Sequence, residues 1–182
     1  MKNIFKASAV LFVSLSLIVS SCKKDEVLIE GCTDNSAMNY QSLATSNNGS
    51  CEFAYDIAQG QWNVETACEE LTISIPVVGD FPIPLNDMFP DTVSITGEGE
   101  GVVAMDINGN IILADVAISG KVAIQDGQKI SLDTGVVGEV DVDITGSGMI
   151  ESASNGDLTL NLAFEIPLAG TQTSSCEISF TR

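Results

Sequence analysis

The sequence has no histidine, few basic residues and few aromatic ones. Its 182 residues include 7 Lys and Arg against 25 Asp and Glu, for a formal net charge of −18. Without a basic surface to neutralise phosphates, the chain is not expected to bind nucleic acid. The absence of His excludes Ser-His-Asp and Cys-His catalysis and His-ligated zinc. At 45% hydrophobic residues the chain is too apolar to be disordered, and its length suits one medium domain with appendages.

Carboxylates are the remaining candidates for catalysis, but none forms a convincing pair. Asp141 and Asp143 fall on the polar side of a predicted strand, and Glu98 and Glu100 flank a glycine in an expected hairpin. A glycosidase needs two positioned carboxylates in a cleft, usually beside aromatic rings, and the chain has one Trp and two Tyr. No Gly-rich phosphate loop precedes a helix. We therefore expect a protein that is not an enzyme and that uses no cofactor and no metal.

Residues 1–21 have the organisation of an export signal. Lys2 and Lys6 precede an apolar stretch over 9–19 that is too short and too polar for a good membrane-spanning helix. The next residues, Val-Ser-Ser-Cys ending at Cys22, match the lipobox of bacterial lipoproteins. This resemblance implies that Cys22 becomes the first residue and carries acyl chains such as palmitate. Each buried CH₂ of these chains contributes about 0.8 kcal/mol to membrane binding.

The tether over 22–30 points to the outer membrane. Lys23, rather than an acidic residue, follows Cys22, so retention in the inner membrane is not expected. The start Cys-Lys-Lys-Asp-Glu resembles lipoproteins common in Bacteroidota, where an acidic cluster after the Cys favours export to the cell surface. We expect an outer-membrane lipoprotein anchored through Cys22 and lean towards its outer face; a plain solvated tether is the alternative explanation of the charged residues.

The cysteine count supports this assignment. Once Cys22 is lipidated, four cysteines remain, which is enough for two disulfides in an oxidising compartment, with three pairings open. A zinc site is disfavoured because the chain has no Cys-x-x-Cys spacing and no His. Cys32 and Cys51 bracket a short polar segment that needs a staple to fold. Cys68 and Cys176 lie in the first and last predicted strands, so we expect the pairs Cys32–Cys51 and Cys68–Cys176.

An antiparallel register with Cys68 opposite Cys176 also separates the flanking residues into a mostly apolar and a mostly polar face of the strand pair. Its mostly apolar face pairs Trp62, Val64 and Thr66 with Arg182, Phe180 and Ile178. The residues between them are mostly polar, as a half-buried antiparallel pair requires. A bridge over so long a loop contributes about 4–5 kcal/mol in the chain-entropy model. The first and last strands are therefore predicted to pair.

Residues 31–51 form a distinct motif, GCTDNSAMNYQSLATSNNGSC. It resembles the GCTDxxAxNYxxxAxxxxGSC module of many exported Bacteroidota proteins. Relatives often carry two acids just before the final Gly-Ser-Cys, where this chain has Asn47 and Asn48. Asp34 is then the only charged residue of the motif, so a calcium site is disfavoured. We expect a small disulfide-stapled module over 31–53.

From residue 54 onward the pattern is typical of antiparallel β-structure. Apolar and polar residues alternate over 140–145 and 158–166, and Asn-Gly and Asp-Gly turn signals separate the runs. We expect strands at 61–69, 71–76, 92–98, 101–107, 110–118, 120–125, 128–133, 136–146, 147–153, 157–166 and 174–182. The tripeptide Ile-Ser-Gly or Ile-Thr-Gly occurs three times and ends at Gly97, Gly120 and Gly146. A strand can bend at such a glycine. No helix is expected after the signal peptide.

Residues 75–90 interrupt the alternation. Four of the five prolines lie here, so a continuous strand is not expected, although the segment is strongly apolar. Such a segment should cover the domain's own core, a ligand or a partner.

The paired first and last strands predict a closed sheet without free edges. Gly60-Gln61-Trp62 resembles the Gly-x-Trp start of lipocalin-like barrels, a family in which a late Arg packs over this Trp. The resemblance covers 60–182 and implies an all-β, lipocalin-like barrel over 54–182 with a structural pair Trp62–Arg182; a β-sandwich is the alternative.

Two functions fit such a barrel. One is binding of a small apolar or amphipathic ligand inside it, by inward residues that would include Trp62, Val64, Ile118, Ile124 and Phe164. The other is a structural or interaction lipoprotein of the cell envelope with a filled core and protein partners. An internal cavity distinguishes the two, and alternation alone does not reveal one.

Overall fold

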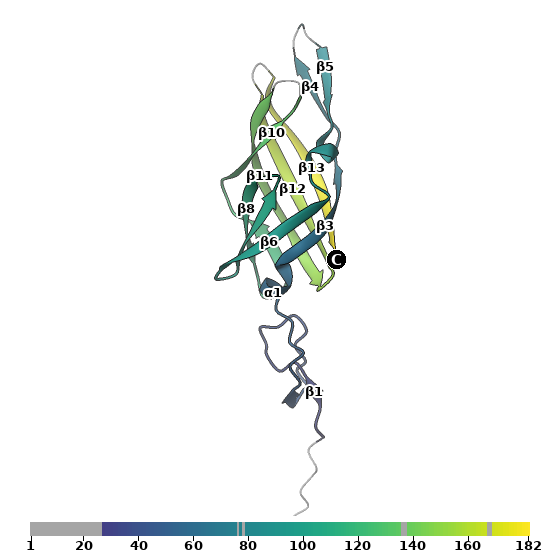
Figure 1. The fold of residues 1–182 in the computed structure, drawn as a ribbon, viewed down its shortest axis with the longest axis vertical. Helices are drawn as coiled ribbons and strands as arrows, with labels where there is room; N and C mark the ends of the chain where they lie inside the picture. The colour runs from purple at the N-terminus through teal and green to yellow at the C-terminus, as the bar shows by residue number, and fades with distance from the viewer. Residues whose placement is uncertain (1–26, 76, 78, 136–137, 167–168) are drawn as a thin grey trace, which may run out of the picture.

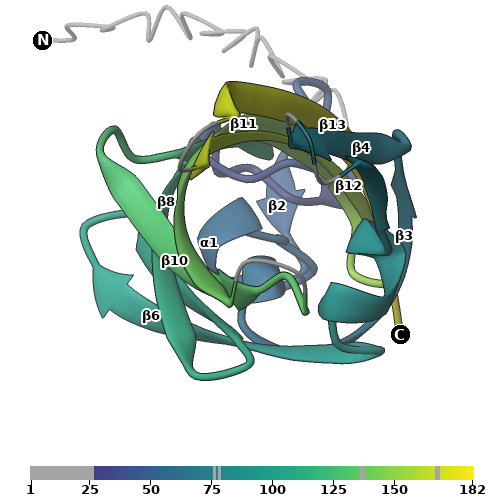
Figure 2. The ribbon, with the colours of Figure 1, turned by 90° about the horizontal axis from the view of Figure 1, so that it is seen from above.

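The structure, a computed structural model, describes residues 27–75, 77, 79–135, 138–166 and 169–182. The predicted signal peptide, Cys22 and most of the tether lie outside these residues. The main body is an antiparallel β-barrel in which most strands pair with the next barrel strand along the chain, and the last strand pairs with the first (Figures 1 and 2). The expected all-β barrel with paired terminal strands is confirmed, and its up-and-down order is that of lipocalins.

The barrel strands follow one another with short connections, except that residues 69–91 separate the first barrel strand from the second. They are β3 Gly60–Cys68, β6 Thr92–Gly99, β7 Val102–Ile107, β8 Asn110–Val116, β9 Lys121–Ile124, β10 Gln128–Asp133, β11 Glu139–Ser152, β12 Asn155–Ile166 and β13 Gly170–Thr181. The pairing of β13 with β3 has the expected register, with Cys176 opposite Cys68 and Phe180 opposite Val64.

The connection at Asp126-Gly127 corrects one expectation. A turn was expected to reverse the chain here, but β9 and β10 run along the same edge of β11: Val122 pairs with Gly148 and Ile130 pairs with Val142. They therefore occupy one strand position, and the described residues close a ring of eight positions.

The two strands expected at 136–146 and 147–153 are a single long strand, β11. Gly146 and Gly148 lie on its inward side, where a Cβ would overlap the backbone carbonyl oxygens of Thr159 and Asp157 on β12. Because they carry no side chain, these glycines let the backbone of β11 coil closely against β12, and the strand continues through both positions. Gly97 also lies at an irregular point within its strand, because β6 shifts register against β7 between Gly97 and Gly99.

The inward face of the barrel forms one apolar core. Alternate residues of β12 are at most 3% exposed. They are Leu158, Leu160, Leu162, Phe164 and Ile166. The alternation predicted from the sequence is thus the division between barrel interior and solvent.

Additional elements close the two ends of the barrel (Figure 1). A short helix, α1 Ala54–Ala58, lies at the end from which the N-terminal segment leaves, here called the lower end. At the upper end, β4 Leu71–Ile75 and β5 Gly79–Ile83 form a hairpin, followed by the 3-10 helix η1 Leu85–Met88.

The strand expected at 71–76 is confirmed as β4, whereas α1 and β5 correct the sequence-based expectations. No helix was expected at 54–58, because five residues are too few to show a helical period. A strand was not expected across the proline-rich segment, yet Pro82 lies within β5 opposite Thr72. The two-stranded β4–β5 sheet has open edges, where a residue without an N–H is tolerated.

The N-terminal module lies below α1 (Figure 1). It contains two very short parallel strands, β1 Glu30–Gly31 and β2 Ser46–Asn47, and otherwise consists of turns.

Candidate functional site

The barrel interior is the first candidate site. Four of the five residues expected to point inward do so: Trp62, Ile124 and Phe164 are at most 7% exposed, and half-buried Val64 packs against the core. Ile118 was placed wrongly, because it lies in the β8–β9 turn and is 67% exposed. Its neighbour Gly120 has φ +87°, so this copy of the Gly pattern marks a turn and not a strand bend.

The interior holds little free space between the described residues. One cavity of about 40 Å³ lies beside Trp62, Met105, Val122, Ile150, Leu158 and Phe180. A second, of about 10 Å³, lies beside Val64, Phe89, Val93, Ile107 and Ile178. Small-molecule sites usually measure about 300–1,000 Å³, whereas the share of one water in the liquid is about 30 Å³. Side chains therefore fill these parts of the interior.

The lower end is closed by contacts between α1 and the first and last strands. The Trp62 indole Nε1 donates a hydrogen bond to the carbonyl of Ala58 (2.8 Å). Arg182 Nη2 donates to the carbonyls of Ile57 (2.7 Å) and Gln59 (2.5 Å). The Arg182 guanidinium carbon lies 3.8 Å from the Trp62 ring centroid, where the resemblance to lipocalins places a late Arg. One cation thus satisfies carbonyls at the end of α1 and covers the indole ring.

Tyr55 and Gly97 complete this closure, and sequence reasoning missed both roles. The Tyr55 hydroxyl accepts a hydrogen bond from the backbone N–H of Gly99 (2.9 Å). A Cβ at Gly97 would overlap that hydroxyl and the Gln59 side chain. The third residue of the Ile-Thr-Gly pattern therefore makes room for α1. Figure 2 shows α1 within the ring of strands.

The upper end is covered by the hairpin and η1. Ile73, Ile83 and Leu85 are at most 5% exposed and belong to the barrel core. The disulfide Cys68–Cys176 joins the upper part of β3 to β13 across a Cα–Cα distance of 3.9 Å. Asn86 in η1 accepts a hydrogen bond at Oδ1 from the backbone N–H of Cys68 (2.7 Å). Much of the apolar proline-rich segment thus covers the domain's own core, one of its expected roles.

The larger hollows lie on the outside of the barrel. A groove of mixed polarity, of about 430 Å³, crosses the outer face of β11, β12 and β13. It is lined by Glu69, Asp143, Thr145, Asn161, Thr173 and Ser175. Asp143 also forms an ion pair with Lys129 (2.9 Å), and this hydrogen bond and charge raise the pKa of the exposed Lys129. The groove presents hydroxyls, an amide and carboxylates, which suit a polar partner.

A second outer groove, of about 460 Å³, lies between the N-terminal module and the lower end of the barrel. It is lined by Ser36, Phe53, Tyr55, Glu100, Val116 and Ile118, so it is of mixed polarity. Both outer grooves have the size of binding sites, which the two interior cavities lack.

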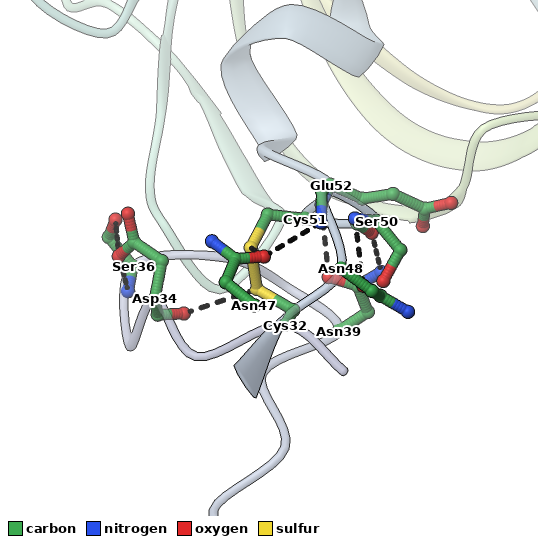
Figure 3. Close-up of a disulfide and its surroundings, with 10 residues drawn as sticks. Cys32, Asp34, Ser36, Asn39, Asn47, Asn48, Ser50, Cys51 and Glu52 are labelled. Atoms are coloured by element: carbon green, nitrogen blue, oxygen red, sulfur yellow. Dashed lines mark hydrogen bonds between the residues drawn. A yellow bond between two sulfur atoms is a disulfide. The ribbon is translucent and has the colours of Figure 1, made fainter. Parts of the chain in front are cut away.

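The N-terminal module is held by its disulfide and by its own side chains (Figure 3). Cys32 and Cys51 form the expected bond. Asn39 donates through Nδ2 to the carbonyl of Ser50 (2.5 Å) and accepts at Oδ1 from the N–H of Glu52 (2.9 Å). The hydroxyl and the N–H of Ser36 donate to the Asp34 carboxylate, which lowers the pKa of Asp34.

The amides of Asn47 and Asn48 act as turn caps. Asn47 and Asn48 each accept a hydrogen bond at Oδ1 from the N–H two residues on, that of Gly49 (2.9 Å) and that of Ser50 (3.0 Å). Within the described ranges, no three His, Cys, Asp or Glu side chains gather to hold a metal ion.

Comparisons with known proteins assign no function to these surfaces. No protein-family model matches the sequence, and no curated protein matches it. No helix within the described part of the chain is long and apolar enough to cross a membrane.

Proposed function

We propose that this chain is a lipid-anchored outer-membrane lipoprotein whose barrel is a filled-core interaction domain for protein partners in the cell envelope. The observation that carries the proposal is the occupied interior: Trp62, Leu158 and Phe180 leave a cavity of only about 40 Å³ at the lower end. Both ends of the barrel are also covered, by α1 and by the β4–β5 hairpin.

The outer surface supports the same proposal. Residues 54–182 contain 20 of the 25 acidic residues and three of the seven basic ones. Such a surface keeps an exported domain soluble and steers association with basic partners. The groove on β11–β13 is a hollowed part of this surface and carries hydroxyl, amide and carboxylate groups.

A small apolar ligand inside the barrel, the other function expected from the sequence, would require the core side chains to move apart. Native mass spectrometry of residues 25–182, purified gently from a periplasm, tests this. We expect the mass of the bare polypeptide. A co-purifying mass that is lost on denaturation would contradict the filled core and favour a carrier.

The partner is tested by site-specific photo-crosslinking in intact cells. A photoreactive residue at Thr173, in the outer groove, should give a discrete crosslinked product. The same residue at exposed Asp133, outside the groove, is the matched control. Equal products from both positions, or none from Thr173, would contradict the groove as the partner site.

The anchor is tested separately by Cys22→Ser. Without the thiol that takes the diacylglyceryl group, the protein should move from the membrane to the soluble fraction. Continued membrane association of the Ser variant would contradict lipid anchoring through Cys22.

A further inference from the structure

Exposed apolar side chains are concentrated at the end of the molecule nearest the proposed anchor. Among the described residues, nine large hydrophobic side chains are exposed, and five of them lie between residues 27 and 43. They are Val27, Leu28, Ile29, Tyr40 and Leu43, here called the proximal patch. Leu28 is 67% exposed and Leu43 is 76% exposed. Three consecutive exposed apolar residues, at 27–29, are unusual on a soluble surface unless they have a function.

Hydrogen bonds hold the two parts of the proximal patch together. The N–H of Thr45 donates to the carbonyl of Ile29 (2.8 Å), and the N–H of Ile29 donates to Thr45 Oγ1 (3.0 Å). Leu43 stands two residues before Thr45 and lies within a turn that the N–H of Ala44 closes by donating to the carbonyl of Gln41. The apolar run 27–29 is thus fixed beside Leu43 on a disulfide-stapled module and is not a free tail.

We propose that the proximal patch rests on the lipid surface and inserts at the boundary between headgroups and acyl chains. This inference rests on the proposed lipid anchor. Cys22 stands five residues before Val27, so the anchor and the patch are separated by at most about 18 Å of extended chain. Apolar residues with a Tyr at their border suit this boundary, where amphipathic structures insert by about 5–10 Å.

Charge favours the same orientation. Residues 22–53, which are the tether and the module, carry five acidic and two basic residues, whereas the barrel over 54–182 carries 20 acidic and three basic ones. Anionic lipids therefore repel the barrel more than the module. The β4–β5 hairpin lies at the far end of the molecule from the module (Figure 1). With the proximal patch on the membrane, this hairpin points away from the lipid.

The test uses the full lipidated chain in vesicles of phosphatidylethanolamine and phosphatidylglycerol, with bromine on the acyl chains near the headgroups as a quencher. Leu43→Trp places a fluorophore in the proximal patch. Wild-type protein gives the background, because its one Trp, Trp62, is 2% exposed. Ile111→Trp is the matched control, since Ile111 is also exposed (55%) but lies near the upper end of β8. Flotation of the vesicles measures anchoring in the same samples.

We expect all three proteins to float with the vesicles and brominated lipid to quench the Leu43→Trp signal about twofold or more, with no quenching at Ile111→Trp. Flotation without quenching of Leu43→Trp would overturn the proximal patch as a lipid contact while the anchor stands. A blue-shifted but unquenched Leu43→Trp would overturn it in favour of a protein covering the patch. Failure of the wild-type protein to float would overturn the anchor itself, and the inference with it.

Discussion

Arg182 covers the indole of Trp62 although the two residues are separated by almost the whole barrel sequence. Its guanidinium carbon stands 3.8 Å from the ring centroid, and its Nη2 binds the carbonyls of Ile57 and Gln59. The residue after β13 thereby fastens the helix that precedes β3. Closure of the barrel and closure of its lower end depend on the same side chain.

Arg182→Ala should therefore lower the free energy of unfolding by about 1–3 kcal/mol, from the lost cation–π contact and the lost charge-assisted hydrogen bonds. Urea unfolding followed by circular dichroism measures it. Lys121→Ala, which also removes one positive charge from the barrel, is the control and should change little. Equal unfolding midpoints for the two variants would show that Arg182 does not stabilise the lower end.

The two disulfides should differ in what they stabilise. Cys68–Cys176 spans 108 residues and joins β3 to β13, so replacing both cysteines by Ala should destabilise the barrel by about 4–5 kcal/mol in the chain-entropy model. Replacing Cys32 and Cys51, which are 19 residues apart in the module, should leave the barrel transition within about 0.5 kcal/mol of wild type. Near-ultraviolet circular dichroism during thermal unfolding follows the Trp62 environment in the barrel. A larger loss from the second pair would contradict this assignment.

The strand pairing of the barrel could be predicted because period-2 alternation records which side of a sheet is buried. The register of Cys68 with Cys176 follows from sorting apolar and polar residues, and any one-residue slip reverses the sorting. The Cys68–Cys176 pair follows from the same argument, whereas the Cys32–Cys51 pair follows from the short polar segment that these two cysteines bracket.

The two barrel ends could not be predicted in this way. The five residues of α1 are too few for a helical period to repeat, and the helix is held by Tyr55 and Arg182, whose partners are distant in sequence. The prolines of the upper hairpin indicated a break, although an isolated two-stranded sheet accepts Pro82. Ile118 follows the same local pattern as Ile95 and Ile144, and only its place in a turn exposes it.

The packing of the barrel interior could not be predicted from the sequence either. Alternation shows which side chains point inward, but free volume depends on how they interdigitate across the barrel. Phe164 and Leu160, from one strand, are both completely buried. The proposed filled core rests on this packing.

Ser36 should control the titration of Asp34. Its hydroxyl and N–H donate to the carboxylate and hold the pKa of Asp34 below its ordinary value. Because the folded-state pKa is lowered, the stabilisation is present above the unfolded-state pKa and is lost as the pH falls through the folded-state value. Carboxyl chemical shifts in NMR should give a lower midpoint in wild type than in Ser36→Ala. Ser42→Ala is the control, and a midpoint unchanged by Ser36→Ala would contradict the role of the Ser36 hydroxyl.

Gly148 should be among the residues of the barrel wall that tolerate no side chain. A Cβ there would overlap the carbonyl of Asp157 and crowd the Cα of Leu158, and both are backbone atoms that cannot rotate away. Gly148→Ala should thus lower the free energy of unfolding by about 2–3 kcal/mol, since relief requires β11 and β12 to separate. Ser147→Ala, at the exposed neighbouring position, should stay within about 0.5 kcal/mol of wild type. If chemical denaturation gives the same stability for both variants, β11 and β12 are not packed as closely at this point as the structure shows, and Gly148 does not cause the coiling of β11.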